Sequence, residues 1–340
     1  MKWVGRIALT VLALTVTLGA ATLAWAWYED RPADGSLAQR FRIPAGEPLA
    51  VTSQRLADGH LIRNPLVFRW LYKVWQGDGT FPSGTFLVPA GMTARQAAAY
   101  FRHAQPLQIK VTVPEGWTST KIARLLEEKE IVSADAFLDV VQHPEALGPL
   151  ADGLTSLEGR LFPDTYHFPP GASAVDVARA FVQTFHDRTA AWQARFTPEE
   201  WDRRIILASI VEREYRAPEE APLIASVFAN RLEKGIALAS CATIEYILTE
   251  VQGRPHPKRI YFVHTQIPSP FNTYLNKGLP PAPIANPGLT ALKAAFEPAE
   301  TDYLYFVVAD ASKGTHTFSS NYSEHEKARE AYLSTFVTKG

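Results

Sequence analysis

The stretch RRIILASIVEREYR, residues 203–216, predicts an amphipathic α-helix and organises the C-terminal half of the chain. Leu207, Ile210 and Val211 share one stripe, and Glu214 falls on the same stripe at the i, i+3, i+4, i+7 spacing. Glu212, two residues earlier, would turn about 200° away, toward the polar side. A continuous helix would therefore direct Glu214, and not Glu212, toward apolar surroundings.

A carboxylate in apolar surroundings resists ionisation, because burial disfavours its charged form and raises its pKa. A raised pKa is what a general acid needs near neutral pH, so Glu214 is the candidate catalytic residue. The alternative is a structural glutamate that pairs with an arginine such as Arg213 or Arg231.

The flanking sequence predicts further helices over residues 134–142, 173–195 and 322–336. The nine histidines lie scattered without a His-x-x-x-His pair, and the chain has no Gly-rich phosphate loop or serine elbow. We therefore predict neither a metal nor a cofactor. The sole cysteine, Cys241, is predicted to be a small buried residue and not a nucleophile.

A weak repeat marks the N-terminal half. Ile43-Pro44-Ala45-Gly46 recurs as Val113-Pro114-Glu115-Gly116, and Val88-Pro89-Ala90-Gly91 is a third partial copy. Each copy predicts a strand that ends at a Pro-x-Gly turn and is followed by a short amphipathic helix. The helix after Gly116 follows the cap candidates Thr118 and Ser119.

The first copy opens a longer predicted unit. A second helix is predicted from Pro65 to Trp75, with Phe68 and Tyr72 on the same side as Trp75, and a closing strand from Gly84 to Val88. Strand, helix, helix, strand is the layout of small LysM-like modules, which bind glycans. The alternative is a duplicated scaffold with no ligand, because the repeat contains no residue that chemistry requires.

The N-terminus carries an apolar run. From Ile7 to Trp27 no residue is charged, and about 20 such residues span a bilayer core. A basic end precedes the run and an acidic end, Glu29 and Asp30, follows it, so the remainder is predicted to lie outside the cytoplasm. The alternative is a signal peptide cleaved near Ala26, although the run exceeds the usual h-region of roughly 7–15 residues.

The composition is that of a globular protein. The 340 residues are 46% hydrophobic and 20% charged, and the formal net charge of −1 gives no reason to expect a nucleic-acid partner. We predict an α+β protein with an N-terminal transmembrane helix, a LysM-like βααβ module and a mixed α/β catalytic domain. The predicted boundaries are 1–6 for a short cytoplasmic end, 7–27 for the transmembrane anchor, 28–40 for a tether, 41–112 for the LysM-like module, 113–156 for the second repeat and a connector, and 157–340 for the catalytic domain.

Five segments carry further motifs, all of them between residues 157 and 326. They are Leu157–Tyr166, Ala208–Glu214, Ser226–Leu232, Ser269–Tyr274 continuing to Gly288, and Tyr303–Val307 with His316–Ser319. In content and order these segments resemble the endolytic murein transglycosylases, the YceG-like family. The chain departs from that family at Tyr215, Ala239 and Cys241, where the family usually has a small hydroxyl residue, Gln and Asp.

The resemblance implies a lyase reaction with one catalytic carboxylate. Glu214 would protonate the glycosidic oxygen between N-acetylmuramic acid and N-acetylglucosamine, then take the proton from the muramoyl 6-hydroxyl as a 1,6-anhydro ring closes. Glu158 and Asp164 are predicted to be structural. The candidate substrate-binding residues are Asn272, Thr273, Tyr274, Asn230, His316 and Ser240.

The resemblance also implies that the substrate is the glycan strand of peptidoglycan, with peptidoglycan synthases (penicillin-binding proteins) as partners. The protein would be anchored once in the cell (inner) membrane, with the catalytic domain on the extracytoplasmic side. One alternative is a non-catalytic scaffold that binds peptidoglycan. Another is a hydrolase, which would need a second carboxylate such as Asp164 or Glu245.

Overall fold

The computed structural model describes residues 2–34, 37–76 and 81–337, and the chain divides into two compact units, Met1–Ile109 and Lys110–Gly340. Gly35 and Ser36 of the predicted tether, and residues 338–340 of the predicted catalytic domain, lie outside the described residues.

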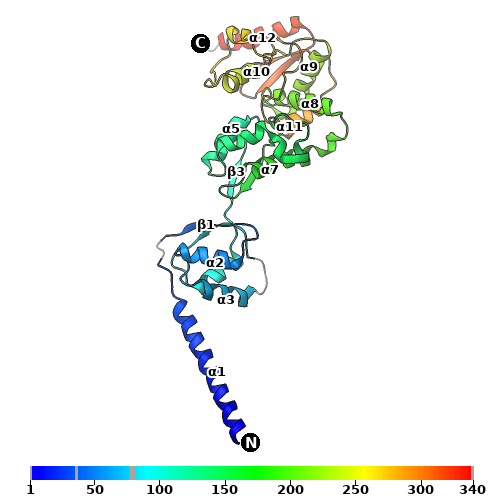
Figure 1. Ribbon diagram of the computed structural model, residues 1–340. Helices are drawn as coiled ribbons and strands as arrows, with labels where there is room; N and C mark the ends of the chain where they lie inside the picture. Colours follow the sequence, from blue (N-terminus) through cyan, green and yellow to red (C-terminus); the bar gives the residue numbers. More distant parts are fainter. Residues whose placement is uncertain (1, 35–36, 77–80, 338–340) are drawn as a thin grey trace. The chain divides into compact units, whose positions relative to one another are not determined.

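The first unit begins with α1, Lys2–Glu29, which Figure 1 shows as one continuous helix. Its segment Leu9–Glu29 is long and apolar enough to cross a membrane, and none of it is buried inside the protein. The predicted tether starts in contact with the module that follows. The Asp30 carboxylate accepts a hydrogen bond from the Arg95 backbone N–H at 2.9 Å and lies 3.4 Å from the Arg95 guanidinium.

The predicted strand–helix–helix–strand order is confirmed. The elements are β1 (Gln39–Ile43), α2 (Leu49–Asp58), α3 (Pro65–Gln76) and β2 (Gly84–Val88), followed by α4 (Ala94–His103). Strands β1 and β2 pair antiparallel, with Phe41 opposite Phe86. Phe68 and Tyr72 of α3 are buried in the core, whereas Trp75, predicted on the same side, is 37% exposed.

The repeated Pro-x-Gly motif forms the same turn three times. Gly46, Gly91 and Gly116 all have positive φ, at 74°, 66° and 72°, which a residue with a Cβ rarely adopts. A strand precedes each turn and a helix follows it, as the sequence predicted. The Thr118 hydroxyl caps the last of these helices by accepting a hydrogen bond from Lys121 N–H at 3.4 Å.

The second unit is a mixed α/β structure in which helices predominate. Its regular elements are β3 (Ile109–Thr112), α5 (Ser119–Glu128), α6 (Ala134–Gln142), β4 (Thr165–Phe168), α7 (Ala174–Gln193), α8 (Pro198–Val211), α9 (Ala221–Glu233), α10 (Cys241–Tyr246), α11 (Leu289–Phe296), β5 (Tyr305–Asp310), β6 (Thr315–Ser319) and α12 (Tyr322–Val337). The structure thus confirms the helices predicted over 134–142, 173–195 and 322–336.

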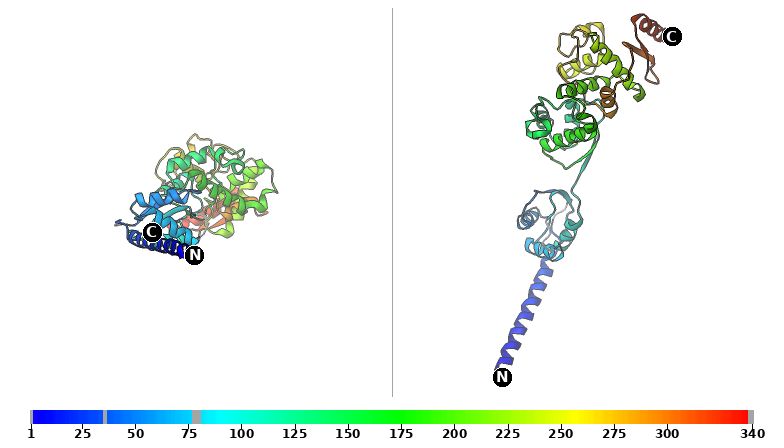
Figure 2. Two further views of the ribbon diagram at one scale, coloured as in Figure 1. Left: turned by 60° about the horizontal axis from the view of Figure 1, so that its bottom comes forward. Right: turned by 90° about the vertical axis from the view of Figure 1, so that its right-hand side faces the viewer.

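Within this unit the strands form two separate pairs, β3 with β4 and the antiparallel hairpin β5–β6. Figure 2 shows α5–α7 at one end of the unit and the hairpin with α12 at the other. The core between them is built from α8, α9 and α11, and Trp201 stacks on Phe296 with ring centroids 4.7 Å apart. Helix α8 therefore runs through the middle of the unit, and this packing fixes the position of the C-terminal end of α8.

Asn286 ties the loops around the core together. Its side-chain oxygen accepts hydrogen bonds from the Gly159 and Leu161 N–H groups at 2.8 and 2.9 Å, and its amide donates to Trp117 O and to the Glu158 carboxylate. Glu158 also accepts from Ser119, and burial raises the pKa of Glu158 to about 7. These contacts make Glu158 part of the scaffold, as predicted.

Candidate active site

Helix α8 begins and ends at different residues from those predicted. It starts at Pro198, behind a capping box in which Thr197 and Glu200 satisfy each other's backbone N–H groups. Leu207, Ile210 and Val211 are buried, as the periodicity predicted. The helix ends at Val211, however, and residues 212–214 form a turn. The predicted continuous helix through Glu214 is therefore wrong, and a turn presents this residue.

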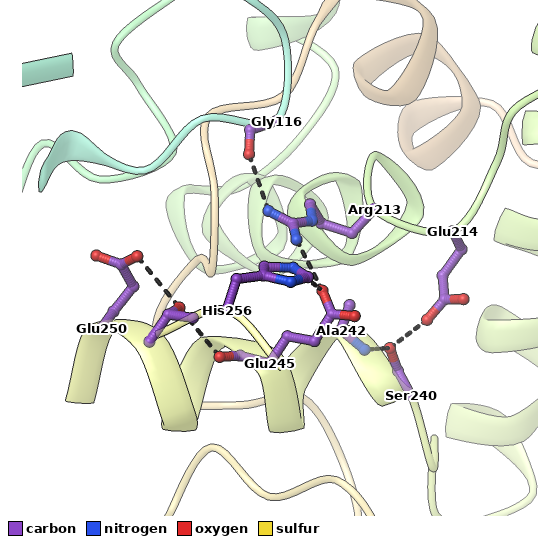
Figure 3. Close-up of polar contacts among 9 residues, drawn as sticks. Gly116, Arg213, Glu214, Ser240, Ala242, Glu245, Glu250 and His256 are labelled. Atoms are coloured by element: carbon purple, nitrogen blue, oxygen red, sulfur yellow. Dashed lines mark hydrogen bonds and ion pairs between the residues drawn. The ribbon is translucent and has the colours of Figure 1, made fainter. Parts of the chain in front are cut away.

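The Glu214 carboxylate accepts a hydrogen bond from the Ser240 hydroxyl through Oε1. Figure 3 shows this contact and the second one that Ser240 makes, in which its Oγ accepts the Ala242 backbone N–H at 3.2 Å. Ser240 is the N-cap of α10, so one hydroxyl both starts that helix and orients the acid. The Ala242 backbone N–H also interacts with the Glu214 carboxylate and, like Ser240, lowers its pKa.

Ser240 is itself held in place from behind. Its N–H donates to Thr273 Oγ1 at 3.1 Å, and the preceding Ala239 N–H donates to Thr273 O at 2.9 Å. Thr243 donates its hydroxyl to Ser240 O, so Thr273 must be the donor in the 2.9 Å contact between the two threonine hydroxyls. These four residues form a buried, mutually bonded support for the Ser240–Glu214 contact.

Burial is the main cause that raises the pKa of Glu214 above its ordinary range, and the negative charge of nearby Glu245 raises it further. The Ser240 hydrogen bond and the proximity of His316 act in the opposite direction and lower the pKa. The net effect is a raised pKa. An acid in this state can donate a proton near neutral pH and then recover it.

Glu245, on α10, is the second carboxylate beside Glu214. Its Oε2 is 2.9 Å from an Arg213 guanidinium nitrogen and 3.4 Å from His256 Nε2. Arg213 also donates to Gly116 O at 3.2 Å, as Figure 3 shows. Arg213 thus pairs with Glu245, and Arg231 donates to the carbonyls of Ala237, Leu238 and Leu304. The alternative in which Glu214 is a structural partner of Arg213 or Arg231 is wrong.

Glu212 was predicted to face a polar surface, and this prediction is wrong. Its Oε2 accepts hydrogen bonds from the Gly288 N–H at 3.0 Å and the Tyr215 hydroxyl at 3.4 Å. Burial, with the nearby charge of Glu115 as a smaller cause, raises the pKa of Glu212 to about 7. Both glutamates of the turn are therefore partly buried, and helical phase does not separate them. What separates them is that Glu212 is bonded into the scaffold.

The predicted substrate-binding residues fall into two groups. Tyr274 and His316 lie close enough to Glu214 for their charges to interact, and Thr273 reaches it through Ser240. His316 Nδ1 is 2.7 Å from Glu220 Oε2, and both side chains are largely buried.

Asn272 and Asn230 form the second group, because backbone carbonyls take up their side chains. Asn272 is fully buried and donates to Thr265 O and Ile267 O at 3.0 and 2.8 Å. Asn230 donates to Thr301 O and Tyr303 O at 2.8 and 2.9 Å. These contacts give both residues a positioning role. Asn272 holds the loop before Thr273, and Asn230, on α9, holds the segment before β5.

The comparison with known protein families decides the classification. The chain matches the YceG-like family over residues 41–331. It belongs to this family. An endolytic murein transglycosylase from Bacillus subtilis (strain 168) is 28% identical over 331 residues, which cover 88% of this chain and 86% of that protein. One from Streptococcus pneumoniae (strain D39) is 26% identical, and the match covers 84% of this chain and 56% of that protein.

A solved structure of a yceG-like protein from Listeria monocytogenes is also similar. Its TM-score is 0.57 and its identity 27%, over 85% of this chain and 99% of that chain. The resemblance on which the sequence analysis relied is thereby confirmed for the whole YceG-like region.

The three departures from the YceG-like pattern all lie around Glu214. Tyr215 contacts Glu212, and Ala239 has a positive φ of 50°, which costs an alanine about 1–2 kcal/mol. Cys241 was predicted to be buried, but it is exposed. Its Sγ lies 3.1 Å from the Tyr274 hydroxyl. Desolvation of the thiol raises the pKa of Cys241.

Sequence reasoning gave little weight to two site residues. Thr243 was not singled out, and Glu245 was considered only as part of a hydrolase. The available signal for Glu245 was its spacing, because Cys241 and Glu245 are four residues apart and so lie on one face of α10. Among the described residues, no group of His, Cys, Asp and Glu could hold a metal ion.

Proposed function

We propose that this chain is an endolytic lytic transglycosylase of peptidoglycan. It cleaves the bond between N-acetylmuramic acid and N-acetylglucosamine within nascent strands and leaves 1,6-anhydro-N-acetylmuramic acid ends, which terminate glycan elongation. The observation that carries the proposal is Glu214, a carboxyl group of raised pKa with one oxygen bonded to Ser240. Two relatives named endolytic murein transglycosylase support the reaction class.

The reaction divides into two proton transfers at the same carboxyl group. Glu214 first donates its proton to the glycosidic oxygen, the bond from that oxygen to C1 of N-acetylmuramic acid breaks, and N-acetylglucosamine leaves as an alcohol. Glu214 is then a carboxylate, which the Ser240 hydroxyl stabilises. It accepts the proton of the muramoyl 6-hydroxyl while that oxygen attacks C1, so the acid is restored and no water is consumed.

The remaining polar groups serve this acid. Thr273 and Thr243 fix Ser240, and Tyr274 with Cys241 forms a wall on which we propose that the sugar rests. The carboxylate of Glu245 lies near enough to Glu214 to interact with it, so it would favour the positive charge that develops at C1 in the transition state.

We further propose that α1 anchors the chain in the cell membrane with the second unit on the extracytoplasmic side. This rests on the apolar segment Leu9–Glu29 and on the basic end that precedes it. The βααβ module in residues 41–112 would hold glycan, and peptidoglycan synthases at the same membrane would supply nascent strands.

The product end tests the reaction class. Purified uncross-linked strands incubated with the full-length protein in detergent should yield internal cuts whose new ends are anhydromuramoyl by mass spectrometry. Binding of the strands without any new chain ends would instead establish the non-catalytic scaffold.

The hydrolase alternative is favoured by one observation, the proximity of Glu245 to Glu214. A hydrolase would leave reducing ends, which incorporate oxygen from labelled water, whereas the transglycosylase incorporates none. In a hydrolase, Glu245→Gln would remove the base that activates water and abolish cutting. In the transglycosylase, it slows cutting and the ends remain anhydromuramoyl.

A further inference from the structure

The segment after α10 has an unusual charge pattern. Between Glu250 and Glu297 the sequence contains no acidic residue, although it contains lysines, arginines and histidines. Its densest part is the loop from Val251 to His264, which we name the basic loop. The cations of this loop are Arg254, Lys258 and Arg259, with His256 and His264 beside them.

The tip of the basic loop is open to solvent. Arg254, Lys258 and Arg259 are exposed, and within residues 2–34, 37–76 and 81–337 no ion pair involves any of them. Phe262 is 80% exposed and Tyr261 58%. The three cations precede the two exposed rings along the loop, and the Arg259 guanidinium lies over the Tyr261 ring, 5.8 Å from its centroid. Exposed cations beside exposed aromatic rings are typical of a surface that meets an anionic partner with apolar parts.

The two ends of the basic loop are fixed to the site. Arg254 N–H donates to Leu248 O at 2.8 Å, and Ile260 packs against the buried cluster of Ile244, Ile247 and Leu248. At the other end, Asn272 holds Thr265 O. A loop with such fixed ends presents its exposed cations in a defined place, so their positions relative to the site are set by the fold.

The basic loop contacts α10, the helix that carries Glu245. His256 Nε2 is 3.4 Å from the Glu245 carboxylate, and Figure 3 shows His256 on the side of Glu245 away from Glu214. Glu245 in turn lies close enough to Glu214 to raise its pKa. When a polymer binds with its cleaved bond at Glu214, the parts of the polymer next to that bond therefore lie toward the basic loop.

We propose that the basic loop binds the peptide stems of the peptidoglycan strand, and that the enzyme selects strands that carry stems over bare glycan. This inference rests on the proposed function. The sugars of the glycan are neutral once the lactyl group of N-acetylmuramic acid is amidated, whereas each stem carries free carboxylates. Arg254, Lys258 and Arg259 match that charge, and the rings of Tyr261 and Phe262 match the apolar side chains of a short peptide.

The test compares one set of uncross-linked strands in two forms, with their stems and after an amidase has removed the stems. The bare form then carries only the lactyl carboxylate on each N-acetylmuramic acid, without the carboxylates and apolar side chains of the stem. The protein is the full chain in detergent, either wild type or with Arg254, Lys258 and Arg259 all changed to Gln. The matched control changes Lys110, Lys129 and Lys234, three exposed cations outside the loop, to Gln. The readout is the ratio of kcat/KM for stem-bearing strands to that for bare strands.

Wild type and the control should prefer stem-bearing strands by about tenfold, as expected for a few exposed ion pairs, and the loop variant should lose most of this preference. Rising salt should reduce the wild-type preference. Equal cutting of both strand types by wild type, or a preference that survives in the loop variant, would overturn the proposal. If the loop variant keeps the preference but no longer binds nanodiscs rich in phosphatidylglycerol, the loop contacts anionic lipid instead.

A binding measurement keeps this test separate from the proposed function. The Glu214→Gln protein, which should bind without cutting, is pulled down with both strand types. A stem preference in binding supports the loop proposal even if no anhydro ends are ever found, and its absence overturns the proposal even if cutting is normal.

Discussion

The hydroxyl of Ser240 is the contact on which the acidity of Glu214 depends most directly, and Ser240→Ala removes it. In the wild type this hydroxyl donates to Glu214 and accepts from the Ala242 N–H. The bond to Glu214 stabilises the carboxylate and lowers its pKa. Without the donor, the ionised form loses its partner in a buried site, so the pKa of Glu214 should rise further.

The size of the shift follows from the strength of such a bond. Hydrogen bonds to charged groups contribute about 1.5–3 kcal/mol. Since one pKa unit corresponds to about 1.4 kcal/mol, the pKa of Glu214 should rise by about 1–2 units. The substitution also removes a helix cap, which costs about 1 kcal/mol of folding stability. The loss of the cap needs its own control, which is Ser173→Ala. The Ser173 hydroxyl caps α7 by accepting the Asp176 N–H and does not contact Glu214.

The assay is the pH profile of kcat/KM, measured as anhydro ends released from uncross-linked strands. Because the free enzyme must carry protonated Glu214, activity falls on the alkaline side as pH passes its pKa. For Ser240→Ala the alkaline limb should move upward by at least about one pH unit. For Ser173→Ala it should stay in place at a similar loss of stability. A Ser240→Ala protein that folds and keeps the wild-type limb would refute this account of the acid.

Two further predictions concern the scaffold. Burial raises the pKa of Glu212 from 4.5 to about 7, so the wild type should lose about 3 kcal/mol more stability than Glu212→Gln as pH rises through that range. Urea unfolding at pH 5 and pH 8 measures this, and a constant difference between variant and wild type would contradict it. Asn286→Ala leaves the buried N–H groups of Gly159 and Leu161 unpaired and should cost about 3 kcal/mol or more, also by urea unfolding. Asn276→Ala, at an exposed position, should cost about 1 kcal/mol, and equal losses would show that the Asn286 contacts are replaceable.

Local patterns predicted the parts of the fold that local physics determines. Pro-x-Gly forces the same turn at Gly46, Gly91 and Gly116, because each turn needs a positive φ. The apolar periodicity around Ile210 predicted the buried face of α8 correctly.

The end of α8 could not be predicted in the same way. Residues 212–216 contain no Pro or Gly that would break a helix. The helix ends where Glu212 bonds to Gly288 N–H and Arg213 reaches Gly116 O, and both partners are more than seventy residues away along the chain. The Ser240–Glu214 bond likewise joins residues 26 positions apart. Family motifs in the sequence therefore led to Glu214 as the proposed acid, whereas the groups that shift its pKa became visible only in the tertiary structure.

The central claim is that Glu214, and not its neighbour Glu212, is the catalytic acid, although burial raises the pKa of both. The most direct test is the yield of anhydromuramoyl ends from Glu214→Gln and Glu212→Gln proteins assayed side by side on the same strands. Loss of a general acid–base group costs about 10²–10⁴-fold, so Glu214→Gln should lose at least that factor while it remains folded. Glu212→Gln should cut well above that level, because its bonds to Gly288 and Tyr215 can be kept by the Gln oxygen. Anhydro ends at the wild-type rate from Glu214→Gln, or their loss only in Glu212→Gln, would contradict the claim.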